Sequence, residues 1–579
     1  MTRKLTPRSN LDSLRKEAKR WLKAIEAGDA EAIARYAAAL STPADKANPS
    51  ETLERSEKPK LREIQHALAR EHGLPSWAAL KQEIEDRART HAQRVALFLE
   101  KSAHRYGTSP ATHKWGGYER DGDYRGEHAA RLLERHPEIA RDSLHTAVAA
   151  GDVEAVRGFL AKDPALANER GWIDRWTPLL RLAYTRLPTE AARTNAVEIA
   201  RLLLDHGADA GARWSEGDNG FSVLTGVIGG GEGGQSAHPQ AEALARLLVE
   251  RGADPLDGQA LYNTSLGADD TFWLDLLWSE SAKRGETARW LEPVNELMDR
   301  PPLEYLLGNA VPRHPKRAAW LLAHGGRGDA RNAYSKQPVV LHAAVAGQRE
   351  LVELLVAHGA EAPVLDEEHQ FVAAALQGDI ETLRRLAARR PGLLRAPDAM
   401  FAALPEDRTD VAEILLDLGM SPDVGDAVDF RALHYSTHCG AVGIAKLLIA
   451  RGAEIDPVER RYHSTPLGHA NYQHRPEMIA TIAPVSRDIK GLCFCGAVER
   501  LRELLAEDAS LARNASRGDW PLFCLPDDDE RALEVAELLL AHGADRNVKN
   551  ADGLTPAAVA RQRGLVETAE LLAAAARKS

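Results

Sequence analysis

The chain has little of what marks several specialised protein classes. Four cysteines among 579 residues are too few for a disulfide framework and are typical of a reducing compartment. Aromatic residues make up 5% of the chain although hydrophobic residues make up 44%, which fits many thin layers of leucine, alanine and valine better than one thick core. Apolar runs of about 18 residues are missing too, which argues against a transmembrane helix.

An excess of positive charge is also missing. The formal net charge of −11 argues against nucleic-acid binding, because a protein that binds nucleic acid normally has a basic face. Residues 1–8 are charged, and no apolar signal core follows them. We therefore predict a cytoplasmic protein that binds neither nucleic acid nor a membrane.

Repetition, by contrast, is abundant. Segment after segment ends on Leu-Leu followed, two or three residues later, by Gly-Ala, and a glycine in that place can adopt the left-handed conformation that closes a helix. Gly325 and Gly359 lie 34 residues apart, and Gly419 and Gly452 lie 33 apart. A fixed period near 33 indicates one supersecondary unit copied along the chain. The copies occupy residues 203–208, 247–253, 354–360, 447–453 and 538–544, with looser versions at 321–326 and 415–420.

The start of each unit is also legible. Thr177-Pro178, Thr465-Pro466 and Thr555-Pro556 each offer a threonine N-cap followed by proline at the first helical position. A tight Gly-Asp turn, as at Gly151-Asp152 and Gly378-Asp379, separates this first helix from a second one. The predicted unit is turn, helix, turn, helix.

These patterns resemble the ankyrin repeat, whose signature is a Thr-Pro-Leu-His-x-Ala opening and a Gly-Ala ending at a period of 33. The resemblance implies an all-α solenoid of about 11–13 repeats, several of them degenerate, over residues 127–579, with a C-terminal cap at 553–579. Residues 257–300 keep helical patterning without either motif, so we place one or two units there on spacing alone.

Residues 1–95 do not follow the period, and we predict a separate helical module for them. Apolar residues at helical spacing indicate a helical hairpin, a polar link at 41–59 and two further helices. The segment Ala69–Trp77 is similar to one that precedes ankyrin arrays in a group of bacterial proteins. Residues 96–126, rich in glycine and aromatics, are the predicted connecting loop, packed on the first repeats.

No segment offers a readable active site. The glycine run at 226–236 lacks the Gly-Lys-Ser/Thr ending of a phosphate loop, so we interpret it as a flexible insertion. The four cysteines lack metal-ligand spacing and are assigned to small core positions. His434 occupies the signature position, where the resemblance implies a hydrogen bond to the turn backbone. We predict no catalytic residue, no cofactor and no metal. The cysteines are Cys439, Cys493, Cys495 and Cys524.

We expect function to lie on the surface of the array. Long, aromatic turn tips follow the first two units, and tryptophan and arginine often anchor interfaces. The alternative for Trp172 and Trp176 is burial against an adjacent repeat or the connecting loop, and Trp214 is the better candidate for an exposed anchor. The predicted partner-binding residues are Trp172, Arg175, Trp176, Tyr184 and Trp214.

Two functions stay open. The first is a non-enzymatic scaffold, monomeric and in a bacterial cytosol, that holds an unidentified protein partner in the concave groove and turn tips. The second is an enzyme or small-ligand-binding protein with an unrecognised site in residues 1–126, where the array recruits the target. Secretion as an effector leaves no certain mark in such a sequence.

Overall fold

The chain folds into two compact units of short helices. The computed structural model describes residues 5, 10–40, 59, 61–74, 77–104, 106, 122–171, 175–216, 219–231, 235–294, 298, 300–515, 520–563 and 565–574. Unit 1 consists of Met1–Ala268 and Phe272–Pro302, and unit 2 of Asp269–Thr271 and Leu303–Ser579. Within the described ranges the sheet structure is one two-stranded hairpin, so the predicted all-α solenoid is confirmed.

Unit 1 begins with a helical module that has its own core. Asn10 caps the first helix by accepting a hydrogen bond from the N–H of Ser13 at 2.8 Å. Leu14, Ala18 and Trp21 follow at helical spacing and are buried against the other helices. The module has the four helices that the apolar periodicity predicts. They are α1 (Leu11–Glu26), α2 (Ala30–Leu40), α3 (Leu61–Glu71) and α4 (Trp77–Ala88).

Helix α5 (His91–Lys101) joins this module to the repeats and crosses the predicted boundary at residues 95 and 96. Its Phe98 and Leu99 belong to one buried apolar cluster with Leu132 of α6 (Gly122–Arg135). Within the predicted connecting loop, residues 96–101 and 122–126 are therefore helical, and residues 102–104 and 106 pack on the repeats. Residues 107–121 lie outside the described residues.

Pairs of a first and a second helix then repeat along both units. In unit 1 they are α7 (Leu144–Ala150) with α8 (Val153–Lys162), α9 (Pro178–Tyr184) with α11 (Ala196–Asp205), α12 (Val223–Ile228) with α13 (Ala241–Glu250), and α14 (Gly258–Ser265) with α15 (Phe272–Lys283). The predicted one or two units at 257–300 are thus the single pair α14 and α15.

Unit 2 continues the same plan. Its pairs are α16 (Pro302–Ala310) with α17 (Pro315–Ala323), α18 (Val339–Val345) with α19 (Arg349–Ala357), α20 (Glu367–Gln377) with α21 (Ile380–Arg389), α22 (Asp398–Ala403) with α23 (Thr409–Asp417), α24 (Ala432–Cys439) with α25 (Val442–Ala450), α26 (Pro466–Tyr472) with α27 (Pro476–Ile482), α28 (Ile489–Cys495) with α29 (Val498–Glu507), η8 (Pro521–Phe523) with α30 (Asp529–Ala541), and α31 (Pro556–Gln562) with α32 (Val566–Ala573). Short elements connect the pairs: η2 (Pro137–Arg141), η3 (Pro164–Asn168), α10 (Glu190–Thr194), β1 (Arg213–Glu216), β2 (Asn219–Ser222), η4 (Thr287–Leu291), η5 (Pro391–Arg395) and η6 (Ala509–Arg513).

The predicted start and stop signals act as local chemistry dictates. At α26 the Thr465 hydroxyl oxygen accepts a hydrogen bond from the N–H of Gly468 at 3.0 Å, and proline occupies the first helical position. After α11, Gly207 has φ +86° and lets the N–H of Ala208 donate to the Leu203 carbonyl at 3.0 Å. The repeat boundaries are thereby fixed by residues within one turn of them.

Carboxylates from neighbouring repeats also stabilise the second helices. The two oxygens of Asp407 accept hydrogen bonds from the N–H groups of Gly443 and Ile444 at the start of α25, both at 2.8 Å. Asp269 does the same for α17, and Asp529 for α32. Each contact satisfies N–H groups that a helix N-terminus leaves open and links successive repeats.

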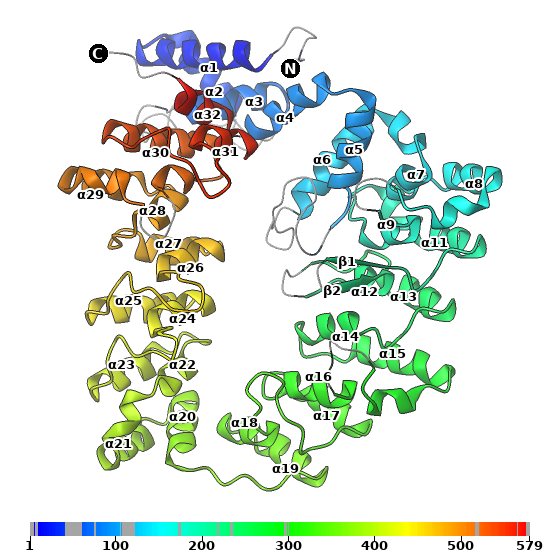
Figure 1. Cartoon of the computed structure of the whole chain (residues 1–579), viewed down its shortest axis with the longest axis vertical. Coiled ribbons are helices and arrows are strands. Elements are labelled where there is room, and N and C mark those ends of the chain that lie inside the picture. The colour runs from blue at the N-terminus through cyan, green and yellow to red at the C-terminus, as the bar shows by residue number, and fades with distance from the viewer. Residues whose placement is uncertain are drawn as a thin grey trace. The chain divides into compact units, whose positions relative to one another are not determined.

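Stacking places the first helices in one row and the second helices in another. In unit 2, α20, α22, α24, α26 and α28 contact one another in that order, as do α21, α23, α25 and α27. Figure 1 shows the row of first helices beside the row of second helices in this unit. Equivalent residues of successive first helices therefore share one face.

Candidate functional site

Three of the five residues predicted to bind a partner are buried in unit 1. Trp176 and Tyr184 are each 1% exposed, and Trp214 is 7% exposed. Ring centroids lie 4.9 Å apart for Trp176 and Tyr184 and 5.5 Å apart for Trp176 and Trp214. The prediction that these three side chains are exposed is wrong, because they pack on one another between repeats. Trp214 was the preferred surface candidate, yet its strand β1 pairs with β2 and its ring stacks on Phe221 at 4.7 Å.

The other two residues predicted to bind a partner are Arg175 and Trp172. Arg175 is exposed and has φ +54°, so its role in partner binding stays a prediction. Trp172 lies outside the described residues.

Tyr106, from the loop predicted to pack on the first repeats, completes the buried ring cluster. Its ring stacks on Phe221 at 4.9 Å and meets Tyr184 edge-on at 6.1 Å. Its hydroxyl donates to the Gly230 carbonyl at 3.1 Å and accepts from the Asn263 amide at 3.0 Å. Burial raises the pKa of the Tyr106 phenol well above its usual value.

The glycine run predicted to be an insertion supports this cluster. Gly229 and Gly230 both have φ +70°, and a Cβ on Gly230 would meet the Asn263 carbonyl oxygen at 3.0 Å. Asn263 also donates to the Gly229 carbonyl at 2.8 Å. The glycines thus allow close packing against α14, and residues 232–234 lie outside the described residues.

Several exposed aromatic side chains lie on unit 2, whereas Phe272, 45% exposed, lies on unit 1. Tyr472 at the end of α26 is 59% exposed, and Phe494 on α28 is 41% exposed. Each stands two residues before a turn residue of positive φ, namely His474 and Gly496. His438 on α24 holds the same position before Gly440 and is also exposed. These three side chains therefore occupy equivalent places on three successive first helices.

Further rings extend this row. Tyr435 stacks on Phe401 of α22 at 4.8 Å and on His438 at 5.9 Å. The Gln473 amide hydrogen-bonds to Nδ1 of His438 at 3.0 Å and so links α24 to the next repeat. We call the set Phe401, Tyr435, His438, Tyr472 and Phe494 the aromatic row.

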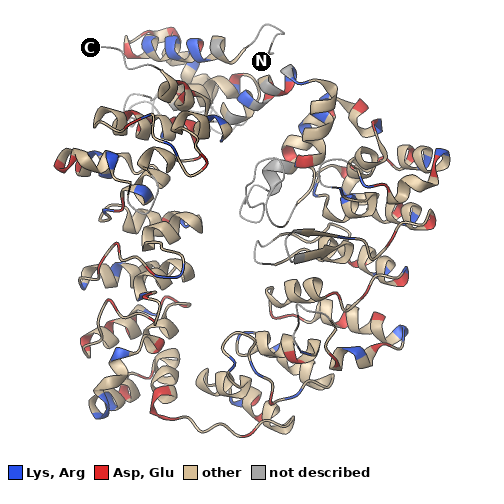
Figure 2. Ribbon diagram, viewed as in Figure 1, with Lys and Arg blue, Asp and Glu red and all other residues tan. Residues whose placement is uncertain are grey.

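Three of the four helices that carry the aromatic row contain no carboxylate, and the fourth, α22, contains Asp398. Helices α24 and α26 contain no lysine, arginine, aspartate or glutamate, and α28 contains only Lys490 (Figure 2). Arg475 reaches across to donate to the His438 carbonyl at 3.2 Å, and Arg531 donates to the Gly496 carbonyl at 3.0 Å. The guanidinium groups cap the carboxyl ends of first helices, where cations are favoured. Partial desolvation of the ring, together with the positive charges of Arg475 and Arg313, lowers the pKa of His438.

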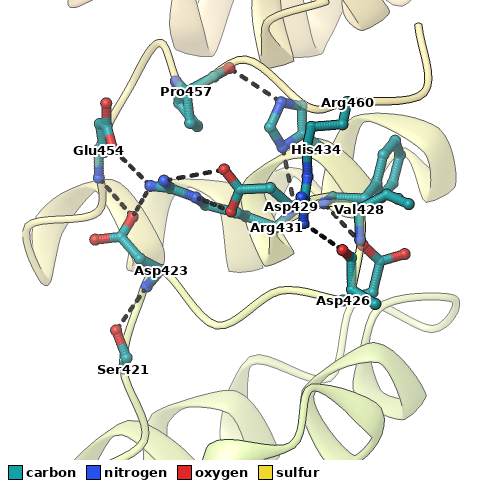
Figure 3. Close-up of polar contacts among 12 residues, drawn as sticks. Ser421, Asp423, Asp426, Val428, Asp429, Arg431, His434, Glu454, Pro457 and Arg460 are labelled. Carbon is teal, nitrogen blue, oxygen red and sulfur yellow. Dashed lines mark hydrogen bonds and ion pairs between the residues drawn. The ribbon is translucent and has the colours of Figure 1, made fainter. Parts of the chain in front are cut away.

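The turn tip beside α24 is ordered by His434 (Figure 3). Its Nδ1 accepts from the N–H of Arg431 at 3.1 Å, and its Nε2 lies 3.1 Å from the Pro457 carbonyl and 3.3 Å from the Ser464 carbonyl. Burial lowers the pKa of His434 to about 4, so the ring is neutral near pH 7. The expected backbone contacts of the signature histidine are confirmed.

Ion pairs surround Arg431 in the same tip. Its guanidinium lies 3.1 Å from Asp429, 3.3 Å from Asp423 and 2.6 Å from Glu454, and Asp423 also accepts from the N–H of Glu454 at 2.9 Å (Figure 3). These contacts raise the pKa of Arg431 against the opposing effect of desolvation. The charges here satisfy one another and hold the tip next to the aromatic row.

Cys493 is fully buried, as a core role requires, and burial raises the pKa of its thiol. In the part of the chain that the structure describes, no group of three or more His, Cys, Asp or Glu side chains is arranged to hold a metal ion. None of the described helices is long and apolar enough to cross a membrane.

Comparison with known proteins gives only structural similarities. No family model matches the sequence, and no curated protein matches it. The crystal structure of the human ASB11 ankyrin repeat domain is 20% identical, with a TM-score of 0.27, over 36% of this chain and 99% of that chain. A chain from the complex of Bd0816, a predatory endopeptidase from Bdellovibrio bacteriovorus, with immunity protein Bd3460 is 22% identical, with a TM-score of 0.24, over 35% of this chain and 96% of that chain. The ankyrin-like fold of this chain is evident from its own stacked helix pairs.

Proposed function

We propose that the chain is a non-enzymatic scaffold that binds a protein partner through the aromatic row of unit 2. The observation that carries the proposal is the exposure of Tyr472 and Phe494 at equivalent positions of adjacent first helices. Large aromatic side chains beside arginine are the residue types that dominate binding energy at protein interfaces. Repeat arrays use such extended surfaces for recognition.

The proposed location differs from the one expected from sequence. Trp176, Tyr184 and Trp214 are used for packing, whereas Tyr472 and Phe494 of the aromatic row are exposed. We further propose that the chain acts as a monomer in a bacterial cytosol, which sedimentation velocity and fractionation of the source cells would check.

The test compares three tagged full-length proteins in affinity capture, read out by mass spectrometry. They are the wild type, the double variant Tyr472→Ala/Phe494→Ala and the control Tyr334→Ala, whose tyrosine is 71% exposed outside the aromatic row. Far-UV circular dichroism first verifies that the helix content is unchanged. We expect a partner retained by the wild type and the control and lost by the double variant. Equal retention by all three would refute binding at the aromatic row.

A further inference from the structure

Hydrogen-bond donors gather around His438 at the carboxyl end of α24. The Gln473 side-chain amide donates to Nδ1 of His438 at 3.0 Å, so the proton of the neutral ring lies on Nε2. Nη2 of Arg475 donates to the His438 carbonyl at 3.2 Å, which leaves further N–H groups of this guanidinium available to a ligand. The end of α24 thus offers donors from an imidazole and from a guanidinium.

A second guanidinium, that of Arg313, acts on the same place. Arg313 lies in the turn between α16 and α17 of unit 2 and is exposed. Burial raises the pKa of Tyr435 and of Cys439, and the positive charge of Arg313 opposes both shifts. Desolvation lowers the pKa of His438, and the charges of Arg475 and Arg313 lower it further. Because such effects fall off with distance, both guanidinium groups lie close to the end of α24.

Neither guanidinium has a carboxylate partner among the described residues. Arg408 stands at the same place in its repeat as Arg475, directly before the second helix, and pairs with Asp410 at 2.8 Å. Glu477 occupies the position of Asp410 in the later repeat, but Arg475 donates to a helix carbonyl instead. Arg313 forms no hydrogen bond or ion pair with any described residue. Two guanidinium groups without counter charge create a positive potential that attracts an anion.

We propose that Arg313, Arg475 and the Nε2 N–H of His438 bind a phosphate monoester carried by the protein partner. This inference rests on the proposed function and adds the chemistry of one group that the partner presents. A phosphate monoester carries about −1.5 to −2 charges at pH 7 and three acceptor oxygens, which match two guanidinium groups and a third donor. A carboxylate carries a single charge and would leave one guanidinium without a counter charge. Arginine is also the side chain whose planar fork binds phosphate with paired hydrogen bonds.

The proposed phosphate site lies within the surface assigned to the partner. Helices α24, α26 and α28 contact one another in that order, and they carry His438, Tyr472 and Phe494 at equivalent places. A phosphorylated side chain bound at His438 therefore brings the adjoining part of the partner beside the exposed aromatic side chains. The charges fix the position of the partner, and the rings supply contact area.

The first experiment measures binding of phenyl phosphate to the full-length protein by phosphorus NMR, above pH 7 and at constant ionic strength. Benzoate, followed by proton NMR, is the matched probe with the same ring and one charge. We expect phenyl phosphate to bind more tightly than benzoate. Arg313→Gln and Arg475→Gln should each weaken it about tenfold, as the loss of a charge-assisted hydrogen bond predicts.

The control variant is Arg531→Gln. It also removes one positive charge, from a guanidinium that donates to the first-helix carbonyl of Gly496 at 3.0 Å, and it should leave the affinity unchanged. Because Arg313 forms no hydrogen bond with the described residues, Arg313→Gln tests the site without disturbing a helix end.

Three results would overturn the phosphate site: no binding of phenyl phosphate, equal affinity for benzoate, or an equal loss of affinity with Arg531→Gln. A second arm treats the lysate with phosphatase before affinity capture and should abolish retention of the partner. Unchanged retention would show that the partner does not carry the phosphate and would overturn the inference on that ground. The proposed function has its own test, because Tyr472→Ala/Phe494→Ala can lose the partner whether or not phenyl phosphate binds.

Discussion

Two glycines inside helices of unit 1 should respond in opposite directions to the same substitution. Gly226 lies in α12, and Gly158 lies in α8. Replacing a helical glycine by alanine ordinarily stabilises a helix by about 0.5–1 kcal/mol, because alanine loses less backbone freedom on folding. The surroundings of the added Cβ decide whether this gain is realised.

At Gly226 the added Cβ has no room. It would meet ring atoms of Tyr184 at 2.4, 2.6 and 2.7 Å. Tyr184 cannot swing away, since its ring lies between Trp176 and Trp214 and its hydroxyl donates to the Ser222 carbonyl at 2.9 Å. Overpacking of a tight core costs about 1–3 kcal/mol. After the helix gain is subtracted, we expect Gly226→Ala to destabilise the protein by about 1–2 kcal/mol.

Gly158 is the matched control because it lies on an exposed helix surface. No heavy atom lies within 4 Å of a Cβ built there. We expect Gly158→Ala to stabilise the protein by about 0.5–1 kcal/mol.

Urea unfolding of both variants would be followed by far-UV circular dichroism and tryptophan fluorescence. The midpoint of the transition that reports unit 1 should fall for Gly226→Ala and rise for Gly158→Ala, with similar slopes. If Gly226→Ala were as stable as Gly158→Ala, the tight packing of α12 on Tyr184 would be refuted. The ring cluster would then have room to move.

Three further perturbations test single contacts in unit 2. Thr465→Ala removes the N-cap of α26 and should lower the free energy of unfolding by about 1 kcal/mol, whereas Thr465→Ser should restore it in the same urea titration. Asp407→Ala removes the carboxylate by which the preceding repeat caps α25. We expect the free energy of unfolding, measured by urea titration, to fall by about 1–2 kcal/mol, and amide exchange at the start of α25 to become faster. His434 has a folded pKa of about 4 against an unfolded value of about 6.5, so the unfolded chain takes up the proton first as the pH falls. Stability should be full above pH 6.5 and decline towards pH 4, and His434→Gln should flatten this part of the unfolding free energy measured against pH.

The repeat plan was predictable because its determinants are local. The cap at Thr465 and the turn at Gly207 each depend on residues within one helical turn. Such residues stand next to the helix end that they determine, so they can be recognised from the sequence alone. Helix α1 was predictable for the same reason, since its buried residues Leu14, Ala18 and Trp21 carry the helical period on their own.

Contacts between repeats could not be predicted in this way. Asp407, in the turn before α23, caps a helix that begins at Val442, and nothing in its immediate sequence distinguishes it from the solvated carboxylates of other turns. Only the stacking of one repeat on the next brings its side chain to α25. The same holds for the Asn263 amide, which fixes the glycine run from the following repeat.

The binding surface predicted at Trp176, Tyr184 and Trp214 was wrong for a different reason. Tyr184 and Tyr472 have the same local signals, so any rule based on the repeat would assign both to the surface or both to the core. Tyr184 is nevertheless buried, because Trp176, Trp214 and Tyr106 from outside its helix pack around its ring, whereas Tyr472 is 59% exposed. In a repeat array the position within the unit determines which face a side chain occupies, but side chains from the turn tips, neighbouring repeats and other segments decide whether it is accessible. Surface residues that bind a partner are therefore best sought where an aromatic position is repeated and its side chain is exposed in the structure.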